Sequence, residues 1–166
     1  FNSSGTWSVP AGVTKCQVIV TGGGSGGYNP YSGAGGGTAI SNITLSGGSA
    51  SITIGAGGGV GSAGGNSTFV YSTTTLTGNG GSASDGNSNH PSVGGDASGG
   101  SLNIGGGDGF LSSAGTNMSG GASYWGGGRT GQSGYSNIGA YGAGGGYSTY
   151  LSSTTSGANG VVVIYY

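Results

Sequence analysis

The sequence has little charge, little proline, one cysteine and no long apolar run. Of its 166 residues, two are Lys or Arg and three are Asp or Glu, giving a formal net charge of −1. Two basic side chains cannot neutralise the phosphates of a nucleic acid or an anionic membrane, so we expect neither as a partner. The longest apolar stretch, residues 161–166, is too short to cross a bilayer, so membrane insertion is not expected.

The same scarcity limits catalysis and metal binding. One histidine, one cysteine and three aspartates supply no zinc site of familiar spacing. A nucleophile elbow, a paired carboxylate and a phosphate-binding Gly-Lys-Ser/Thr sequence are also missing, so we expect no enzyme activity and no cofactor. Cys16 alternates with β-branched neighbours, which favours a buried strand thiol, with an intermolecular disulfide as the alternative.

Glycine dominates what is present. There are 47 glycines, roughly four times the usual share, but only three prolines and no unbroken Gly-X-Y register, which excludes collagen. Disorder is typical of highly charged chains with few aromatic residues, whereas this chain carries ten tyrosines, two tryptophans and three phenylalanines. We therefore expect one ordered domain over residues 1–166. Since the chain begins at Phe1, without a methionine or leader-like segment, we expect a processed product or an excised domain.

The glycines recur three residues apart, as in Gly55, Gly58, Gly61 and Gly64. Three is the period of a left-handed extended helix, in which glycine on one edge lets neighbouring backbones touch. The spacing predicts a bundle of polyglycine II-like helices, stabilised mainly by backbone hydrogen bonds. The glycine-tract body and its loops are expected over residues 22–159.

The two ends have β patterns. Residues 6–21 and 160–166 predict terminal strands, with a short first strand at residues 6–9 before the Pro10–Gly12 turn. Residues 12–21 and 160–166 are rich in β-branched residues and are expected to pair with each other or to lie in one sheet. Residues 38–45 and 49–54 predict a hairpin across Ser46–Gly48, and residues 67–76 predict one or two strands. No segment keeps an apolar period of 3.6, so the expected fold class is all-β without a significant α-helix.

Large side chains outside the strands gather in the segments that interrupt the glycine tracts. Loops on a rigid scaffold are where recognition usually occurs, and aromatic side chains stack on sugars or anchor protein interfaces. For these aromatics, binding and scaffold packing are equally open. The candidate binding residues are Tyr28, Asn29, Tyr31, His90, Phe110, Tyr124, Trp125, Arg129, Tyr135 and Tyr141.

Three stretches carry a family resemblance. Residues 1–14, with Trp7 and the Val9-Pro10-Ala11-Gly12 turn, lead through a strand into the glycine tract at 22–27. Together with residues 52–59 and 157–166, this order resembles the glycine-rich domain at the ends of many bacteriophage tail fibres. Similar domains occur in secreted bacterial surface proteins. The resemblance implies a β framework, a sandwich of polyglycine II helices and loops that bind bacterial surface proteins or polysaccharide.

Two functions follow as hypotheses. The first is a non-enzymatic receptor-binding domain at a tail-fibre tip, extracellular or on the virion, which recognises a bacterial surface glycan or outer-membrane protein. The alternative is a secreted subunit that assembles into an extracellular filament, as a homo-oligomer or polymer, by pairing residues 161–166 as an exposed strand or by stacking glycine-rich faces. Ice binding is a weaker third hypothesis, because the threonines do not mark every third position.

Overall fold

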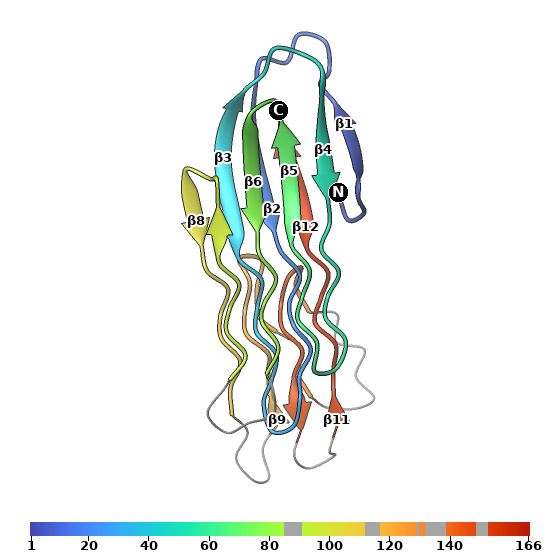
Figure 1. Ribbon diagram of the computed structural model, residues 1–166, viewed down its shortest axis with the longest axis vertical. Helices are drawn as coiled ribbons and strands as arrows, with labels where there is room; N and C mark the ends of the chain where they lie inside the picture. The colour runs from blue at the N-terminus through green and yellow to red at the C-terminus, as the bar shows by residue number, and fades with distance from the viewer. Residues whose placement is uncertain (85–90, 112–116, 129, 132–138, 149–152) are drawn as a thin grey trace.

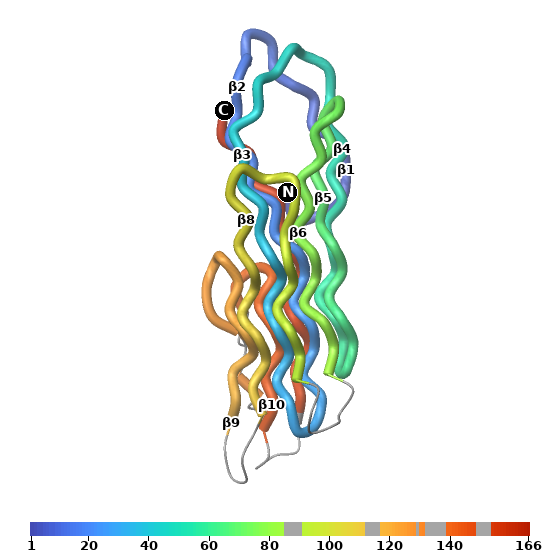
Figure 2. The backbone as a smooth tube through the Cα atoms, turned by 60° about the vertical axis from the view of Figure 1, so that its left-hand side comes forward, coloured from blue at the N-terminus to red at the C-terminus, as the bar shows by residue number. Residues whose placement is uncertain are grey.

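The computed structural model is an elongated molecule with a β-sheet half and a glycine-tract half (Figure 1). The structure describes residues 1–84, 91–111, 117–128, 130–131, 139–148 and 153–166. Within these ranges it is all-β, with antiparallel sheets and no helix, as the sequence predicts. Both chain ends lie in the β-sheet half, as Figures 1 and 2 show.

Two sheets form the β-sheet half. The five-stranded sheet has the order β1-β4-β5-β6-β7, and the four-stranded sheet has the order β12-β2-β3-β8. The strands of the first are β1 (Gly5–Ser8), β4 (Ser49–Thr53), β5 (Ser67–Tyr71), β6 (Thr74–Gly78) and β7 (Ala97–Ser98). Those of the second are β12 (Val161–Tyr165), β2 (Lys15–Thr21), β3 (Thr38–Thr44) and β8 (Leu102–Ile104).

The core lies between these two sheets. Phe69 and Leu76 of one sheet and Val18 and Val20 of the other are fully buried, and Trp7 packs on Phe69 with ring centroids 6.4 Å apart. Cys16 is buried in the same core, so the prediction of a buried strand thiol is confirmed. Alternation along each strand directs every second side chain inward, which is the pattern visible in the sequence.

The terminal strands pair as predicted, whereas the predicted hairpin is wrong. In β12, Val161 lies opposite Thr21 of β2. Residues 38–45 and 49–54 do not pair with each other, because β3 and β4 belong to different sheets. The connection crosses between the sheets through Gly47 and Gly48, both at φ +84°, and the Tyr71 hydroxyl donates to the Gly47 carbonyl at 2.7 Å. Inward-facing and outward-facing residues alternate in both strands, and this alternation alone does not predict which of the two sheets a strand joins.

Below the sheets, the glycine tracts run side by side along the long axis (Figure 2). In the tract 22–27, successive N–H groups donate to three neighbours in turn. Gly22 and Ser25 donate to the tract 33–37, Gly23 and Gly26 to the tract 62–65, and Gly24 and Gly27 to the tract 155–158. The donor–acceptor distances are 2.9–3.1 Å, and the partner numbers fall as the donor numbers rise, so these neighbours are antiparallel.

Close backbone approach requires glycine at many of these positions. An added Cβ at Gly26 would overlap the carbonyl oxygen of Gly59, and one at Gly24 would overlap that of Ala143. At Gly59, on an outward edge, an added Cβ would meet nothing within 4 Å. The hydrogen bonds and close contacts therefore repeat every three residues, the period expected of an extended helix with three residues per turn. The polyglycine II conformation itself stays a prediction.

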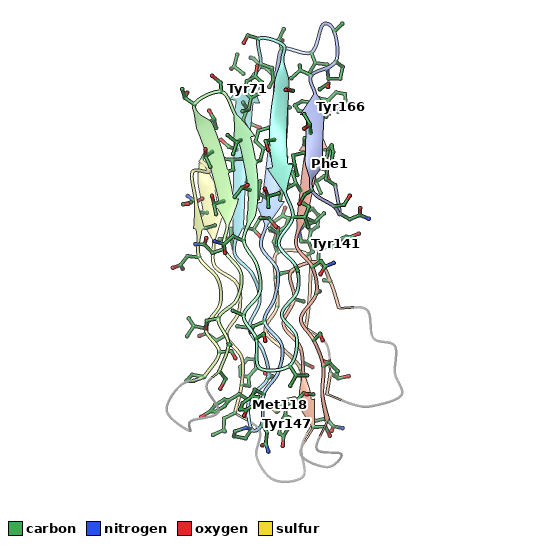
Figure 3. The ribbon with its side chains drawn as sticks, turned by 45° about the vertical axis from the view of Figure 1, so that its right-hand side comes forward. Phe1, Tyr71, Met118, Tyr141, Tyr147 and Tyr166 are labelled. Carbon is green, nitrogen blue, oxygen red and sulfur yellow. The ribbon has the colours of Figure 1, made fainter. Side chains whose placement is uncertain are left out.

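A three-stranded sheet lies at the far end of this half. It has the order β11-β10-β9, with β9 (Asn117–Met118), β10 (Tyr147–Ser148) and β11 (Ser153–Thr154). Figure 3 shows Met118 and Tyr147 at this end, opposite Tyr71 and Tyr166 in the β-sheet half. We call the end that carries β9, β10 and β11 the tip.

Candidate binding surface

A tight turn brings the first glycine tract back at the tip. Tyr28 and Tyr31 face each other in a bridge, with the Tyr28 N–H donating to the Tyr31 carbonyl at 2.8 Å. The next N–H, that of Ser32, donates to the Phe110 carbonyl, and the Ser32 hydroxyl accepts from the Phe110 N–H. The turn and the segment at 110–111 are thus held together by backbone and side-chain hydrogen bonds.

Around this turn, several large apolar side chains are exposed. Phe110 is 55% exposed, Leu111 forms a bridge with Tyr31, and Tyr28 lies over Gly61 in the neighbouring turn that carries Val60. Val93 follows Ser92, whose carbonyl accepts from the Gly109 N–H. We call these five exposed side chains the tip patch: Tyr28, Val60, Val93, Phe110 and Leu111. Exposed apolar groups that gather at one end of a molecule are typical of an interaction site.

Tyr31 has a different place from its neighbour. Its side chain is only 2% exposed, and its hydroxyl has no hydrogen-bond partner among the described residues. Tyr31 therefore contributes to packing beneath the tip and does not present a contact surface. Asn29, two residues before it in the same turn, is exposed.

The remaining described candidates lie away from the tip. Tyr124 and Trp125 contact each other edge to face, with centroids 5.1 Å apart, and the Trp125 indole N–H donates to the Thr21 hydroxyl at 2.9 Å. Thr21 ends β2, so Trp125 is fixed against the β-sheet half. Ser123 donates to the Tyr141 carbonyl, and Figure 3 shows Tyr141 at mid-height. We call Tyr124, Trp125 and Tyr141 the waist cluster.

The candidates predicted from sequence thus fall into separate groups. Tyr28, Asn29 and Phe110 lie at the tip, the waist cluster lies near the junction of the two halves, and Tyr31 is buried. His90, Arg129 and Tyr135 lie outside the described residues. Sequence reasoning missed Val60, Val93 and Leu111. A usable signal was present at Val60, a large apolar residue between glycines in a tract that otherwise has only small residues.

The titratable groups of the described residues include one buried thiol, that of Cys16. No group of three or more His, Cys, Asp or Glu side chains among them is placed to hold a metal ion. Burial raises the pKa of the Cys16 thiol, so this thiol stays protonated and unreactive near neutral pH. In the described part of the chain, no helix is long and apolar enough to cross a membrane.

The described chain is a β-sandwich that continues into a body of close-packed glycine tracts and ends in a tip with exposed apolar side chains. A family model described as a glycine-rich domain matches residues 2–166, and the chain belongs to this family. No curated protein matches the chain.

Proposed function

We propose that this glycine-rich domain is a non-enzymatic receptor-binding domain of a bacteriophage tail fibre, on the virion. Its tip patch contacts a glycan or an outer-membrane protein on the bacterial surface. The observation that carries this proposal is the exposure of Tyr28, Val60, Phe110 and Leu111 around the turn that ends the first glycine tract. Such side chains supply apolar area for an interface, and Tyr28 adds an amphipathic aromatic ring.

The rigidity of the support favours recognition as well. Tyr28 is held by backbone hydrogen bonds to Tyr31, and Phe110 is held by hydrogen bonds to the backbone and the hydroxyl of Ser32. The tract 22–27 that leads into this turn bonds to three neighbours, so the turn is positioned before a partner arrives, which lowers the entropy lost on binding. The resemblance of the opening and closing segments to tail-fibre domains supports the same proposal.

The filament alternative has less support in the contacts of β12. Val161 and Val162 are buried, and β2 covers one edge of the strand. On the other edge, Val162 exchanges hydrogen bonds with Phe1 at 2.7 and 3.1 Å. Fewer backbone N–H and C=O groups of β12 are thus available for pairing with another chain than an exposed terminal strand would present.

Two leucines of nearly equal exposure, one in the tip patch and one far from it, provide a matched pair of variants. Leu111 at the tip is 52% exposed, and Leu102 of β8 in the β-sheet half is 53% exposed. The domain is first tested for binding to panels of bacterial cells and their extracted polysaccharides and outer-membrane proteins. On the surface that is bound, Leu111→Ser is expected to weaken binding about tenfold, whereas Leu102→Ser leaves it unchanged.

Equal binding by the two variants would reject the tip as the contact surface. Light scattering on native material tests the alternative at the same time. A monomer or a small closed oligomer is expected, and long uniform polymers would favour the filament subunit.

A further inference from the structure

An open pocket lies on the outer face of the four-stranded sheet, in the half of the molecule opposite the tip. Its volume is about 490 Å³, within the range of small-molecule sites. The pocket is lined by residues of β2, β3 and β12, of which Lys15, Gln17, Asn42, Thr44 and Tyr165 are exposed, and the end of β12 lies beside the C mark in Figure 1. The proposed tip function does not involve these residues.

Strand register places the lining side chains in two rows. Tyr165 lies opposite Gln17, which in turn lies opposite Asn42, so an aromatic ring and two amides form one line across three strands. Lys15 lies opposite Thr44 in the next row. Since side chains two residues apart share a face, both rows point to the outside of the sheet.

The polar groups of this pocket are only partly used within the protein. The Gln17 amide donates to the Asn42 side-chain oxygen at 3.4 Å, a weak bond, and within the described ranges the Gln17 oxygen and the Asn42 amide nitrogen have no further partner. Lys15 is exposed and has no ion pair among the residues that the structure describes. It is the one lysine of a chain that has two basic side chains in all.

We infer that this pocket binds an acidic saccharide. Tyr165, 56% exposed, offers a ring face on which a sugar can stack, the two amides match sugar hydroxyls, and Lys15 matches a carboxylate. An acidic peptide would use Lys15 but would gain little from a flat ring beside paired amides. Because the groups stand on paired strands instead of loops, their spacing is fixed before the ligand binds.

The test uses trigalacturonate and its fully methyl-esterified form, which have the same sugar skeleton with and without charge. In an NMR titration of the whole chain, trigalacturonate is expected to shift the backbone amides of residues 15–17 and 42–44. The ester is expected to bind about tenfold more weakly, because it offers no carboxylate to Lys15.

Three variants complete the test, and amide spectra first establish that each is folded. Lys15→Gln is expected to weaken trigalacturonate binding about tenfold and to remove most of its salt dependence. Tyr165→Ala is expected to weaken binding of both sugars about fivefold. Leu102→Ser, on the same sheet but outside the pocket lining, is expected to change neither.

The inference is overturned if trigalacturonate shifts no amide of the pocket, or if Lys15→Gln and Tyr165→Ala leave its affinity unchanged. Equal binding of the acid and its ester would also overturn it, as would binding of oligoglutamate in preference to the saccharide. Leu111→Ser is expected to keep pocket binding intact, so a failed pocket and a failed tip give different results.

Discussion

The β-sheet half and the glycine-tract half are held together by different interactions. In the first, Phe69, Leu76, Val18 and Val20 are removed from water between two sheets, as in an ordinary β-sandwich. In the second, the tracts have few apolar side chains to bury, and each backbone bonds to several neighbours. Glycine loses more backbone entropy on folding than other residues, so dense hydrogen bonding has to offset a larger cost. In the glycine-tract half, the close packing contacts are therefore made between backbones and not between side chains.

The largest effect is expected from a side chain placed between tracts. In Gly26→Ala the new methyl group would overlap the Gly59 carbonyl oxygen, and backbone atoms cannot rotate away. We expect the free energy of unfolding to fall by more than about 3 kcal/mol, measured by chemical denaturation. Gly59→Ala is the matched control, because its methyl group meets nothing and restricts the unfolded chain, for a gain of about 0.4–1 kcal/mol. Similar losses in both variants would contradict backbone packing as the reason for glycine.

In the β-sheet half, removal of a side chain should matter more than addition of one. Phe69→Ala deletes a fully buried ring beside Trp7 and is expected to lower the free energy of unfolding by about 3–5 kcal/mol. Val70→Ala changes the next residue, which points outward, and should cost less than about 1 kcal/mol. Thermal or denaturant unfolding measures both, and comparable losses would argue against the sandwich core.

The contact between the halves at the waist is expected to be weaker. Trp125→Phe keeps an aromatic ring but removes the indole N–H that donates to Thr21. The expected loss is about 1 kcal/mol, seen as faster amide hydrogen exchange in residues 123–126. Tyr124→Phe, which alters the exposed partner of the ring pair, serves as control. Unchanged exchange in Trp125→Phe would show that this hydrogen bond does not fix the segment.

The smallest effect concerns pH. Burial raises the pKa of the Cys16 thiol above its ordinary value of 9.0. The unfolded chain therefore releases this proton at lower pH than the folded chain does. The contribution of the buried, protonated Cys16 thiol to stability is complete at pH values below its ordinary pKa. This contribution is lost as the pH rises through the pKa that the thiol has in the folded chain. The difference in unfolding free energy between the native chain and Cys16→Ala should be flat at neutral pH and should shrink above it. A difference independent of pH up to 11 would contradict the burial of the thiol.

The strand pattern of the sequence predicted much of the β-sheet half. Alternation located β2, because period two is set by the backbone of a single strand, and a continuous run of β-forming residues located β12. The two strands lie in one sheet and pair, in line with the prediction that they pair or share a sheet. It could not predict that β3 and β4 separate at Gly47, since each strand of a sandwich shows the same alternation in either sheet. That choice depends on long-range contacts such as the hydrogen bond from Tyr71 to Gly47.

In the glycine-tract half, spacing indicated period three but not which glycines are essential. Gly26 and Gly59 both lie in glycine tracts and cannot be told apart from the sequence. Glycine is required at position 26 because a neighbouring backbone lies against it, whereas position 59 has room for a side chain. The binding surface was predicted in part for the same reason. Tyr28 and Tyr31 share one turn, yet Tyr28 is exposed and Tyr31 is buried. The packing of the neighbouring tracts decides which side of the turn faces solvent, and the local sequence does not contain that information.

In the glycine-tract half, the backbone N–H groups of the tract 22–27 donate to three neighbouring tracts with a period of three residues. NMR couplings measured across hydrogen bonds test this directly, because they identify the carbonyl that each N–H donates to. We expect Gly22, Gly23 and Gly24 to couple to Gly37, Gly65 and Ala158. Ser25, Gly26 and Gly27 are expected to couple to the same three tracts, at Ala34, Ser62 and Thr155. Couplings that alternate between only two neighbours, as in a β-sheet, would contradict this pattern.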